Sequence, residues 1–597
     1  MCGISGEITW DGSEPDVGAV ARMSAHQVSR GPDGHGVWSS PRAALGHRRL
    51  AIIDLSPRGA QPMVDPDLGL TVVFNGCIYN HRELRAELEA AGHRFSSTSD
   101  TEVLLKGYAE WGLSFVEHLV GMFAFCLVEH ESGRAVLGRD RLGVKPLYLS
   151  ERTGSLRFAS TLPALVEGGG VDTTIDPVAV HHYLTFHAIV PAPRTLLKGV
   201  TKLPPASVMV VGPDGTTRTH RYWSPAFGGE SALAARSEEE WRDTVEDALR
   251  TAVRRRLVAD VPVGVLLSGG LDSSLIVGLL AQEGQRDLAT FSIGFESAGG
   301  EQGDEFRWSD QVVERFATDH HKLQIPTGEV LDAVVPTVDA MAEPMVSHDV
   351  VAFYLLSKEV AQHVKVVQSG QGADEVFAGY HWYQGLGTGP ASLDDDVDAY
   401  AEVFFDRSDD EVAAVVAGHH ATGDPSRAFA HSHFSGPGAA TALDRALRID
   451  TEVMLVDDPV KRVDNTTMAW GLEARVPFLD HELVEVAMAL PPAMKTGQGG
   501  KAVLKDIARS VLPADVIDRP KGYFPVPPLV HLETDAVGLL RDVLCHDDAR
   551  ARGLFDPAHV EELVREPHQL TRLRYNQLWE LGILELWFQT HVPSASW

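Results

Sequence analysis

The sequence predicts two domains of different class, an α+β domain followed by an α/β domain with a doubly wound parallel sheet. Two observations support this division. Up to about residue 210, short β-branched and aromatic runs are bounded by Gly, Asn, Asp or Ser, which is typical of strands joined by turns. Beyond about residue 240, apolar runs alternate instead with helical patterns, and this β-loop-α repetition indicates a buried parallel sheet.

In the first domain, two amphipathic segments at 81–92 and 101–112 end in glycine and are expected to be helices. A Pro-rich passage and then an Ala/Ser/Glu stretch near 226–240 carry little strand signal, so we place the linker there. The predicted domains are therefore 2–215 and 235–597. Strands are expected at AALGHRRLAIID, LTVVFNGCIYN, GMFAFCLVE, RAVLGRD and LRFAS.

In the second domain, three strand-like runs each lead into a polar loop and a helical pattern. They are VPVGVLL (261–267), LATFSIGF (288–295) and VKVVQSG (364–370). In such folds ligands bind beyond the carboxyl ends of the strands. The acidic run LDDDVD (393–398) is expected to be a solvated loop, and the final stretch LTRLRYNQLWELGILELWF is expected to pack on the core.

The composition excludes several classes of function. The formal net charge of −31 opposes binding to nucleic acid or to an anionic membrane, because phosphate binding needs clustered Lys and Arg. The four cysteines include no CxxC pair. We see no signal peptide and no apolar run of membrane-spanning length. We therefore expect a cytoplasmic protein with reduced, free thiols.

The segment SGGLDSS (268–274) lies between a predicted strand and a predicted helix and is a candidate phosphate loop. Its small residues let the backbone approach an anion, and the N–H groups at the helix start favour phosphate. Ser268, Ser273 and Ser274 add hydroxyl donors, whereas Asp272 needs a bridging Mg²⁺ to face phosphate. The Walker pattern is absent. The alternative is an ordinary Gly/Ser turn that caps a helix.

The end of a second predicted strand weakens the alternative that SGGLDSS is only an ordinary Gly/Ser turn. SGQGADE (369–375) again places glycines and acids directly after a strand, and Asp374 is a candidate second carboxylate on the same metal. Because parallel strands end at one edge of a sheet, both loops are expected to face one ligand.

Several ordered motifs then identify a family. SGGLDSS is similar to the pyrophosphate loop of enzymes that cleave ATP to AMP and pyrophosphate. Further motifs, in chain order, are the MCGI start, RGPDG (30–34), GHRRL (46–50), FNGCIYN (74–80), SDTEVLL (99–105), RDRLGVKPLY (139–148) and GLEARVPFLD (471–480). With these motifs the chain resembles the glutamine-hydrolysing asparagine synthetase family (B type) over nearly its whole length. The resemblance implies an N-terminal nucleophile glutaminase domain of αββα layering, then an ATP-pyrophosphatase synthetase domain that uses ATP and Mg²⁺.

For the first reaction, Cys2 is the expected nucleophile once the initiator methionine is removed. It then carries both a thiol and a terminal amine, whose pKa near 8 lets part of it act as a base. By resemblance, Asn75 and Gly76 form the oxyanion hole. Arg49 is expected to clamp the carboxylate of glutamine and Asp100 to hold its α-amino group.

One residue of this pocket departs from the family pattern. Relatives commonly have Asn-Gly-Glu at the oxyanion turn, whereas this chain has Cys77 in place of the acid. The lost carboxylate helps to receive glutamine in relatives, so some contact is expected to be rearranged or weaker. We interpret Cys77 as a small side chain in the glutamine pocket rather than as a second nucleophile.

For the second reaction, the resemblance implies that a carboxylate attacks the α-phosphorus of ATP and that ammonia then attacks the acyl-adenylate. Asp272 and Asp374 resemble the Mg²⁺ ligands, and Lys521 in RPKGYF resembles a lysine that stabilises adenylation. Lys501 is also expected near the phosphates, with a solvated helix lysine as an equal alternative. The expected nucleotide contacts are Leu267, Ser268, Gly269, Gly270, Asp272, Ser273, Ser274, Ile293, Ser369 and Gly370.

A second departure concerns the acceptor. Asparagine synthetases generally carry an acid where this chain has Gln371, so an acceptor other than aspartate is expected. The chain looks most like the branch that amidates N-acetylglutaminylglutamine, and aspartate is the alternative. Glu343 and His348 lie in the segment 342–349 that shapes the acceptor pocket in relatives.

The expected partners are therefore glutamine, ATP and a small carboxylate acceptor, with no nucleic acid and no membrane; a homodimer is one assembly that the resemblance allows. Two rival hypotheses stay open: a glutaminase with a vestigial ATP site, and a non-catalytic adenine-nucleotide sensor. The His pairs at 181–182 and 320–321 are interpreted as structural.

Overall fold

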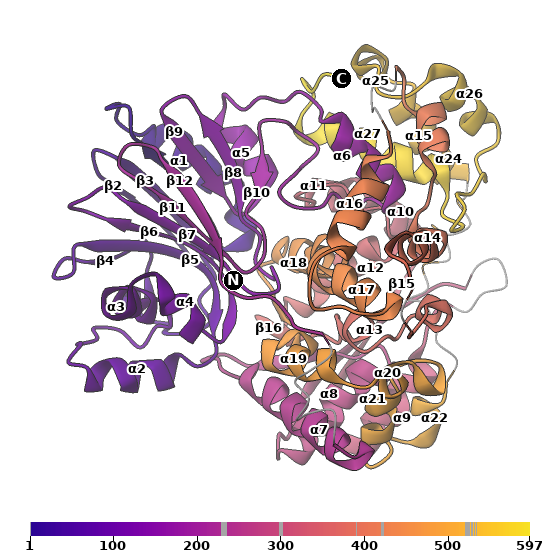
Figure 1. Cartoon of the computed structure of the whole chain (residues 1–597), viewed down its shortest axis with the longest axis horizontal. Coiled ribbons are helices and arrows are strands. Elements are labelled where there is room, and N and C mark those ends of the chain that lie inside the picture. The colour runs from indigo at the N-terminus through magenta and orange to yellow at the C-terminus, as the bar shows by residue number, and fades with distance from the viewer. Residues whose placement is uncertain are drawn as a thin grey trace.

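The chain forms two bodies that lie side by side, with the N-terminus at their junction (Figure 1). The structure is a computed structural model that describes residues 2–227, 236–297, 303–389, 391–418, 423–519, 526, 529, 532 and 534–597. Within these ranges, no helix combines the length and the apolar character needed to cross a membrane.

The first body is built on two antiparallel sheets of six strands each. One sheet has the order β10 (Thr201–Lys202), β8 (Tyr148–Arg152), β9 (Ser155–Ala159), β1 (Gly3–Thr9), β3 (Ala43–Arg49) and β2 (Gly34–Ser39). The other has the order β12 (Thr217–Arg221), β11 (Ser207–Val211), β7 (Ala135–Arg139), β6 (Gly121–Glu129), β5 (Leu70–Ile78) and β4 (Met63–Asp65).

Helices cover the outer face of each sheet, which gives four layers. An apolar cluster that includes Ile4, Val73 and Phe158 fills the space between the sheets. One outer face packs against α1 (Val17–His26) and α5 (Leu162–Gly168). The other packs against α2 (His81–Ala90), α3 (Thr101–Trp111) and α4 (Phe115–His118), on the far side of the body (Figure 1). This αββα layering confirms the predicted α+β domain.

The second body contains a five-stranded sheet in which every pair of neighbours is parallel. Helices cover both faces of this sheet. One face packs against α7 (Glu238–Arg255), α8 (Leu271–Gln282) and α21 (Ala502–Ala508), and the other against α11 (Val334–Asp339), α12 (Asp349–Val360) and α27 (Gln577–His591). The predicted doubly wound α/β domain is confirmed. The strand order is β15 (Asp319–Ile325), β14 (Ala289–Phe295), β13 (Val263–Leu266), β16 (Val366–Gln368) and β17 (Glu473–Arg475).

The remaining helices surround this sheet in the second body (Figure 1). Their bounds are α6 (Pro177–Thr185), α9 (Phe306–Phe316), α10 (Thr327–Asp332), α13 (Ala373–Val376), α14 (Leu393–Phe404), α15 (Asp409–Val415), α16 (Pro425–Phe434), α17 (Ala442–Ile449), α18 (Lys461–Met468), α19 (His481–Ala489), α20 (Pro492–Thr496), α22 (Ala514–Ile517), α24 (Thr534–Leu544), α25 (Asp547–Arg552) and α26 (Pro557–Arg565).

One expected loop is a helix, so the prediction for 393–398 is wrong. The run begins α14, whose N-cap Ser392 accepts a hydrogen bond from the backbone N–H of Asp395. Acidic side chains in the first turn are favourable there because they face the positive end of the helix dipole. Asp396 is only 2% exposed and pairs with Arg445, so this acid is part of the interior.

A continuous helical path links α17 to α18 through two π-helical turns, Asp450–Met454 and Val456–Val460. The second turn contains Pro459, whose missing N–H cannot support regular α-helical bonding. Beyond it, α18 is buried along its whole length. Its side chains reach both bodies, as described below.

Two candidate active sites

The first candidate site is a small cavity of about 30 Å³ in the first body. Its lining includes Cys2, Arg49, Gly76 and Asp100, and Asn75 contacts Cys2 directly. The residues predicted for glutamine hydrolysis therefore meet at one place although they come from separate strands and loops. Antiparallel pairing explains this, because β1 and β3 lie next to one another in one sheet while β5 belongs to the sheet packed against it.

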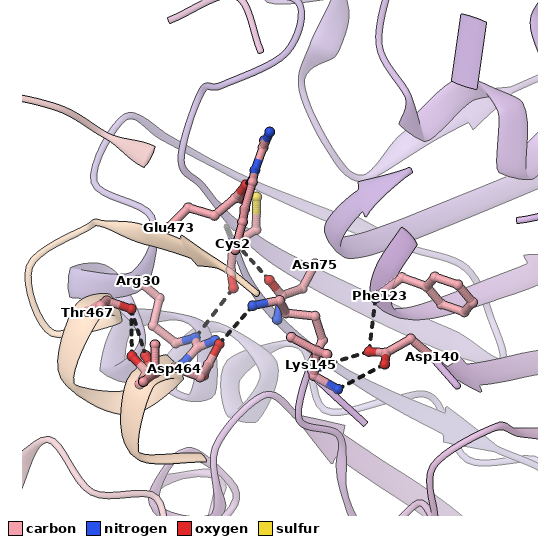
Figure 2. Close-up of polar contacts among 12 residues, drawn as sticks. Cys2, Arg30, Asn75, Phe123, Asp140, Lys145, Asp464, Thr467 and Glu473 are labelled. Atoms are coloured by element: carbon pink, nitrogen blue, oxygen red, sulfur yellow. Dashed lines mark hydrogen bonds and ion pairs between the residues drawn. The ribbon is translucent and has the colours of Figure 1, made fainter. Parts of the chain in front are cut away.

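Asn75 has the geometry expected of an oxyanion donor. Its Oδ1 accepts a hydrogen bond from the backbone N of Cys2 at 2.9 Å, which fixes the orientation of the amide (Figure 2). Its Nδ2 is buried and has no hydrogen-bond partner among the described residues. At the next position, a Cβ on Gly76 would lie 2.1 Å from the carbonyl oxygen of Met122, so only glycine fits there.

Arg49 and Asp100 are held where a substrate amino acid could meet them. Arg49 donates to the carbonyl oxygen of Ser56 at 3.0 Å and to that of Asp54. Asp100 accepts from the backbone N of Ile78 at 3.0 Å, and burial raises the pKa of its carboxyl. Both side chains line the cavity, so they offer a cation and a carboxylate to opposite ends of a zwitterion.

The two thiols of this cavity differ in setting. Burial raises the pKa of the Cys2 thiol. Burial raises the pKa of Cys77 much further, so this thiol stays protonated. Cys77 also lines the cavity and is 1% exposed. It is therefore a small neutral wall of the pocket and a poor nucleophile.

A buried ionic cluster behind Cys2 was missed in the sequence. Arg30 donates from Nε to the carbonyl oxygen of Cys2 at 3.4 Å and from Nη1 to Asp464 at 2.9 Å (Figure 2). Lys145 pairs with the same carboxylate at 3.2 Å. Burial raises the pKa of Asp464, but Arg30 and Lys145 outweigh it and hold the pKa below its usual value. Asp464 lies on α18, so the second body contributes to the support of Cys2 in the first.

The second body also contributes directly to the wall of the first cavity. Glu473 and Arg475, both on β17, line it, and Arg475 donates from Nε to Glu473 at 2.6 Å. Burial raises the pKa of Glu473, but nearby positive charges, Arg475 and Lys145 among them, outweigh it and lower the pKa to about 2. The motif GLEARVPFLD was noted in the sequence, but only the fold shows that it reaches the neighbouring domain.

The second candidate site is a larger cavity of about 380 Å³ at the carboxyl ends of β13, β14 and β16. Of the predicted nucleotide contacts, Gly269 and Ser274 do not line it. Gly269 forms the turn with a φ of +73°, where a Cβ would lie 2.6 Å from the backbone N of Ser309. The predicted residues that line it are Leu267, Ser268, Gly270, Asp272, Ser273, Ile293, Ser369, Gly370, Gln371 and Asp374.

Lys501 joins the two predicted metal ligands. Its Nζ lies 2.7 Å from Asp272 and 3.0 Å from Asp374, and the side chain is buried. The alternative of a solvated lysine therefore does not hold. Two carboxylates that face one cation fit Mg²⁺, which is usually held by one or two carboxylates with phosphates and waters. The described residues contain no group of three or more His, Cys, Asp or Glu placed to hold a metal by themselves.

The predicted acceptor residues are not brought together. Gln371 lines the second cavity, but Glu343 and His348 do not. Glu343 accepts from the Tyr148 hydroxyl at 3.1 Å and pairs with Lys202 at 3.0 Å, at the junction of the two bodies. Burial lowers the pKa of His348 to about 4. Lys521 lies outside the described residues.

Comparisons with known proteins agree with this two-site arrangement. The sequence model of the asparagine synthase family matches residues 244–589, and that of the glutamine amidotransferase domain matches residues 1–223. The chain belongs to the asparagine synthase family. It is thus a glutamine-dependent amidotransferase of the asparagine synthetase type, an ATP-dependent amide ligase.

The chain is similar over most of its length to curated bacterial members of the family. It is 29% identical over 609 residues to asparagine synthetase [glutamine-hydrolyzing] 1 of Bacillus subtilis (strain 168), covering 96% of this chain and 94% of that protein. It is 30% identical to synthetase 3 of the same organism, covering 94% and 93%. It is 30% identical to asparagine synthetase B of Escherichia coli (strain K12), covering 88% and 82%.

Proposed function

We propose that this amidotransferase converts the carboxylate of N-acetylglutaminylglutamine to a carboxamide, with ammonia taken from glutamine. The observation that carries the choice of acceptor is Gln371, which lines the second cavity where asparagine synthetases generally hold an acid. A neutral amide there suits an acceptor that lacks the ammonium group of aspartate. Aspartate is the second candidate, because the similar proteins are named asparagine synthetases.

In the proposed first reaction, the Cys2 thiolate attacks the side-chain amide carbon of glutamine. The terminal amine accepts the thiol proton, and the tetrahedral oxyanion is received by Asn75 Nδ2 and the Gly76 N–H. When the C–N bond breaks, the departing nitrogen takes that proton and leaves as ammonia. Water then adds to the thioester carbonyl, and glutamate leaves as Cys2 regains its proton.

In the proposed second reaction, an oxygen of the acceptor carboxylate attacks the α-phosphorus of ATP and the bond to pyrophosphate breaks. Asp272 and Asp374 would hold Mg²⁺, which would neutralise charge on the phosphates. Lys501 keeps these two carboxylates facing one point and carries positive charge itself. Lys521 is proposed to stabilise the same charge. Ammonia then attacks the acyl carbon, loses a proton and displaces AMP.

The test uses the full chain with ATP, Mg²⁺, glutamine and either N-acetylglutaminylglutamine or aspartate, and identifies the amide by mass. The dipeptide amide together with pyrophosphate is the expected product pair. Asparagine as the sole amide would overturn the proposed acceptor, while no pyrophosphate with any acid would favour a glutaminase with a vestigial ATP site. The Gln371→Glu variant restores the family acid, so its preference for the dipeptide over aspartate should fall about tenfold or more.

A further inference from the structure

The charged side chains that line the second cavity, within the described part of the chain, fall into two groups. The first group surrounds the predicted phosphate site. It consists of Lys501 with the two predicted metal ligands, Lys505 one turn later on α21, and Arg519, which pairs with Glu305 at 2.7 Å. A Cβ on Gly270 of the phosphate loop would lie 4.0 Å from Arg519 Nη2, so this arginine lies beside the loop. These cations are therefore placed for the phosphates of ATP.

The second group is Asp349 with Arg462, which we call the wall pair. Asp349 is the first residue of α12, and Arg462 lies on α18. Arg462 Nη1 donates to Asp349 Oδ1 and, at 2.9 Å, to Ser347 Oγ. Asp458 lies 4.0 Å from Arg462 but does not line the cavity, so it helps to hold the guanidinium without facing a ligand. The wall of the cavity therefore carries both signs of charge at this point.

The wall pair lies next to the place where the acceptor must react. The acceptor carboxylate attacks the α-phosphorus, and the phosphates are expected beside Asp374. Gly379 packs against that acid, since a Cβ there would lie 2.2 Å from Asp374 Oδ1. Tyr380 follows and also lines the cavity. Burial raises the pKa of Tyr380 and the positive charge of Arg462 opposes that rise, so these two side chains lie close together. An acceptor that reacts beside Asp374 therefore has the wall pair beside its body.

The wall pair offers one hydrogen-bond donor and one acceptor to a ligand. Arg462 Nη2 and Asp349 Oδ2 make no hydrogen bond with any described residue, because Nη1 and Oδ1 make the bonds within the wall. Neither free atom is buried beyond the reach of solvent. An amide can accept from Nη2 and donate to Oδ2 at once, whereas a carboxylate accepts from Nη2 but is repelled by Asp349. The wall pair therefore suits an uncharged amide better than a carboxylate.

We propose that the wall pair binds an amide of the acceptor, and that Asp349 makes the site reject acceptors that carry a second carboxylate. The substrate class is thus a monocarboxylic acid whose remainder is uncharged and contains amides, as in an N-acylated peptide. This inference rests on the proposed function and extends the choice of acceptor from Gln371 to a second position in the same cavity.

The test compares two acceptors that differ in charge and hardly in shape. They are N-acetylglutaminylglutamine and N-acetylglutamylglutamate, in which both side-chain amides are replaced by carboxylates. The full chain is assayed for pyrophosphate release with ATP, Mg²⁺ and glutamine, and the measured quantity is the ratio of kcat/KM for the two acceptors. The parent chain is expected to prefer the diamide by about tenfold or more. A parent chain that uses both acceptors equally would overturn the proposal.

The two single variants of the wall pair should change this ratio in opposite directions. Asp349→Asn leaves the cation of Arg462 facing the cavity, so the preference for the diamide should fall about tenfold or more. Arg462→Met leaves the carboxylate of Asp349 there, so the preference should rise. A pair that only fastens α12 to α18 would lower both rates alike in both variants. An unchanged ratio in Asp349→Asn, which keeps the shape of the side chain, would therefore refute the proposal.

Glu305→Gln is the matched control, because Glu305 also pairs with an arginine in the lining but lies beside the phosphate loop. It should raise the KM for ATP and leave the acceptor ratio as in the parent chain; a shift as large as that of Asp349→Asn would overturn the assignment to the wall pair.

Failure of the proposed function gives a different result. If the parent chain amidates aspartate alone, the proposed acceptor is wrong, and the wall pair is then tested with aspartate and β-alanine, which lacks the α-carboxylate. Asp349→Asn should still raise the use of aspartate relative to β-alanine, because it removes the repelling charge. A fall in that ratio, or no change, would overturn the inference about the wall pair.

Discussion

Asn75→Ala offers the sharpest test of the glutaminase geometry. The substitution removes Nδ2, one of the two donors proposed to receive the oxyanion. This atom is buried and already oriented by the bond from Cys2 N to Oδ1 at 2.9 Å, so the donor needs no reorganisation when charge develops. Removal of one such donor lowers kcat by about 10²–10³, equivalent to roughly 2.7–4 kcal/mol of transition-state stabilisation.

The same substitution also removes the acceptor of the Cys2 N–H, and this loss can be bounded. A neutral hydrogen bond contributes about 1 kcal/mol net, roughly a fivefold effect, so the donor loss should dominate. The assay is the kcat of glutamine hydrolysis, measured as glutamate release, beside ammonia-dependent synthesis by the same variant. The second reaction should stay within about twofold of the parent, because the synthetase cavity contains no part of Asn75.

Asn80, just after the end of β5, provides a matched control. Asn80 also makes two bonds through its amide, to the carbonyl oxygen of His118 and from the backbone N of Val120, but it does not line the cavity. Asn80→Ala should therefore leave kcat nearly unchanged. Equal losses in the two variants, or a parallel loss of ammonia-dependent synthesis in Asn75→Ala, would refute the oxyanion role.

Three further outcomes are expected. Cys2→Ala should lose glutamine-dependent synthesis and keep ammonia-dependent synthesis; loss of both in a folded protein would contradict two separate sites. Asp272→Asn should abolish pyrophosphate release while glutamine hydrolysis continues, since Asp272 lies in the other cavity; unchanged pyrophosphate release would exclude its role. Burial raises the pKa of Asp450 to about 7 despite hydrogen bonds from Tyr383 and Tyr400. The folded state then binds a proton that the unfolded state has lost, so stability falls as pH rises from about 4 to 7. Asp450→Asn should reduce this fall in the unfolding temperature, and an unchanged pH profile would contradict the assignment.

Much of the architecture could be read from local pattern. Alternating and aromatic runs predicted the antiparallel strands, and the run 121–129 coincides with β6. The acidic run 393–398 misled because net charge was taken as a sign of solvation. Ser392 as N-cap and the pairing of the buried Asp396 with Arg445 decided the helix instead, and Arg445 lies 49 residues away from Asp396.

The residues of the candidate sites also fall into those that a local pattern predicts and those that it does not. Cys2, Asn75 and Asp272 could be predicted as candidate site residues because each occurs in a short motif whose chemistry depends on adjacent residues, and the structure places each of them at one of the two cavities. Arg30 and Asp464 were missed because their pairing spans 434 residues, and no local spacing records a contact between two domains.

The sequence by itself was enough to predict two candidate reaction centres, because a thiol beside the initiator methionine and a glycine-rich loop after a strand have meaning without any distant neighbour. Tertiary structure alone decided how the centres are supported. It placed β17 in the wall of the glutaminase cavity and Lys501 between two carboxylates, and it paired Asp349 with Arg462 in the wall of the second cavity. These features depend on burial, which desolvates charges and leaves each dependent on the partner that packing brings to it.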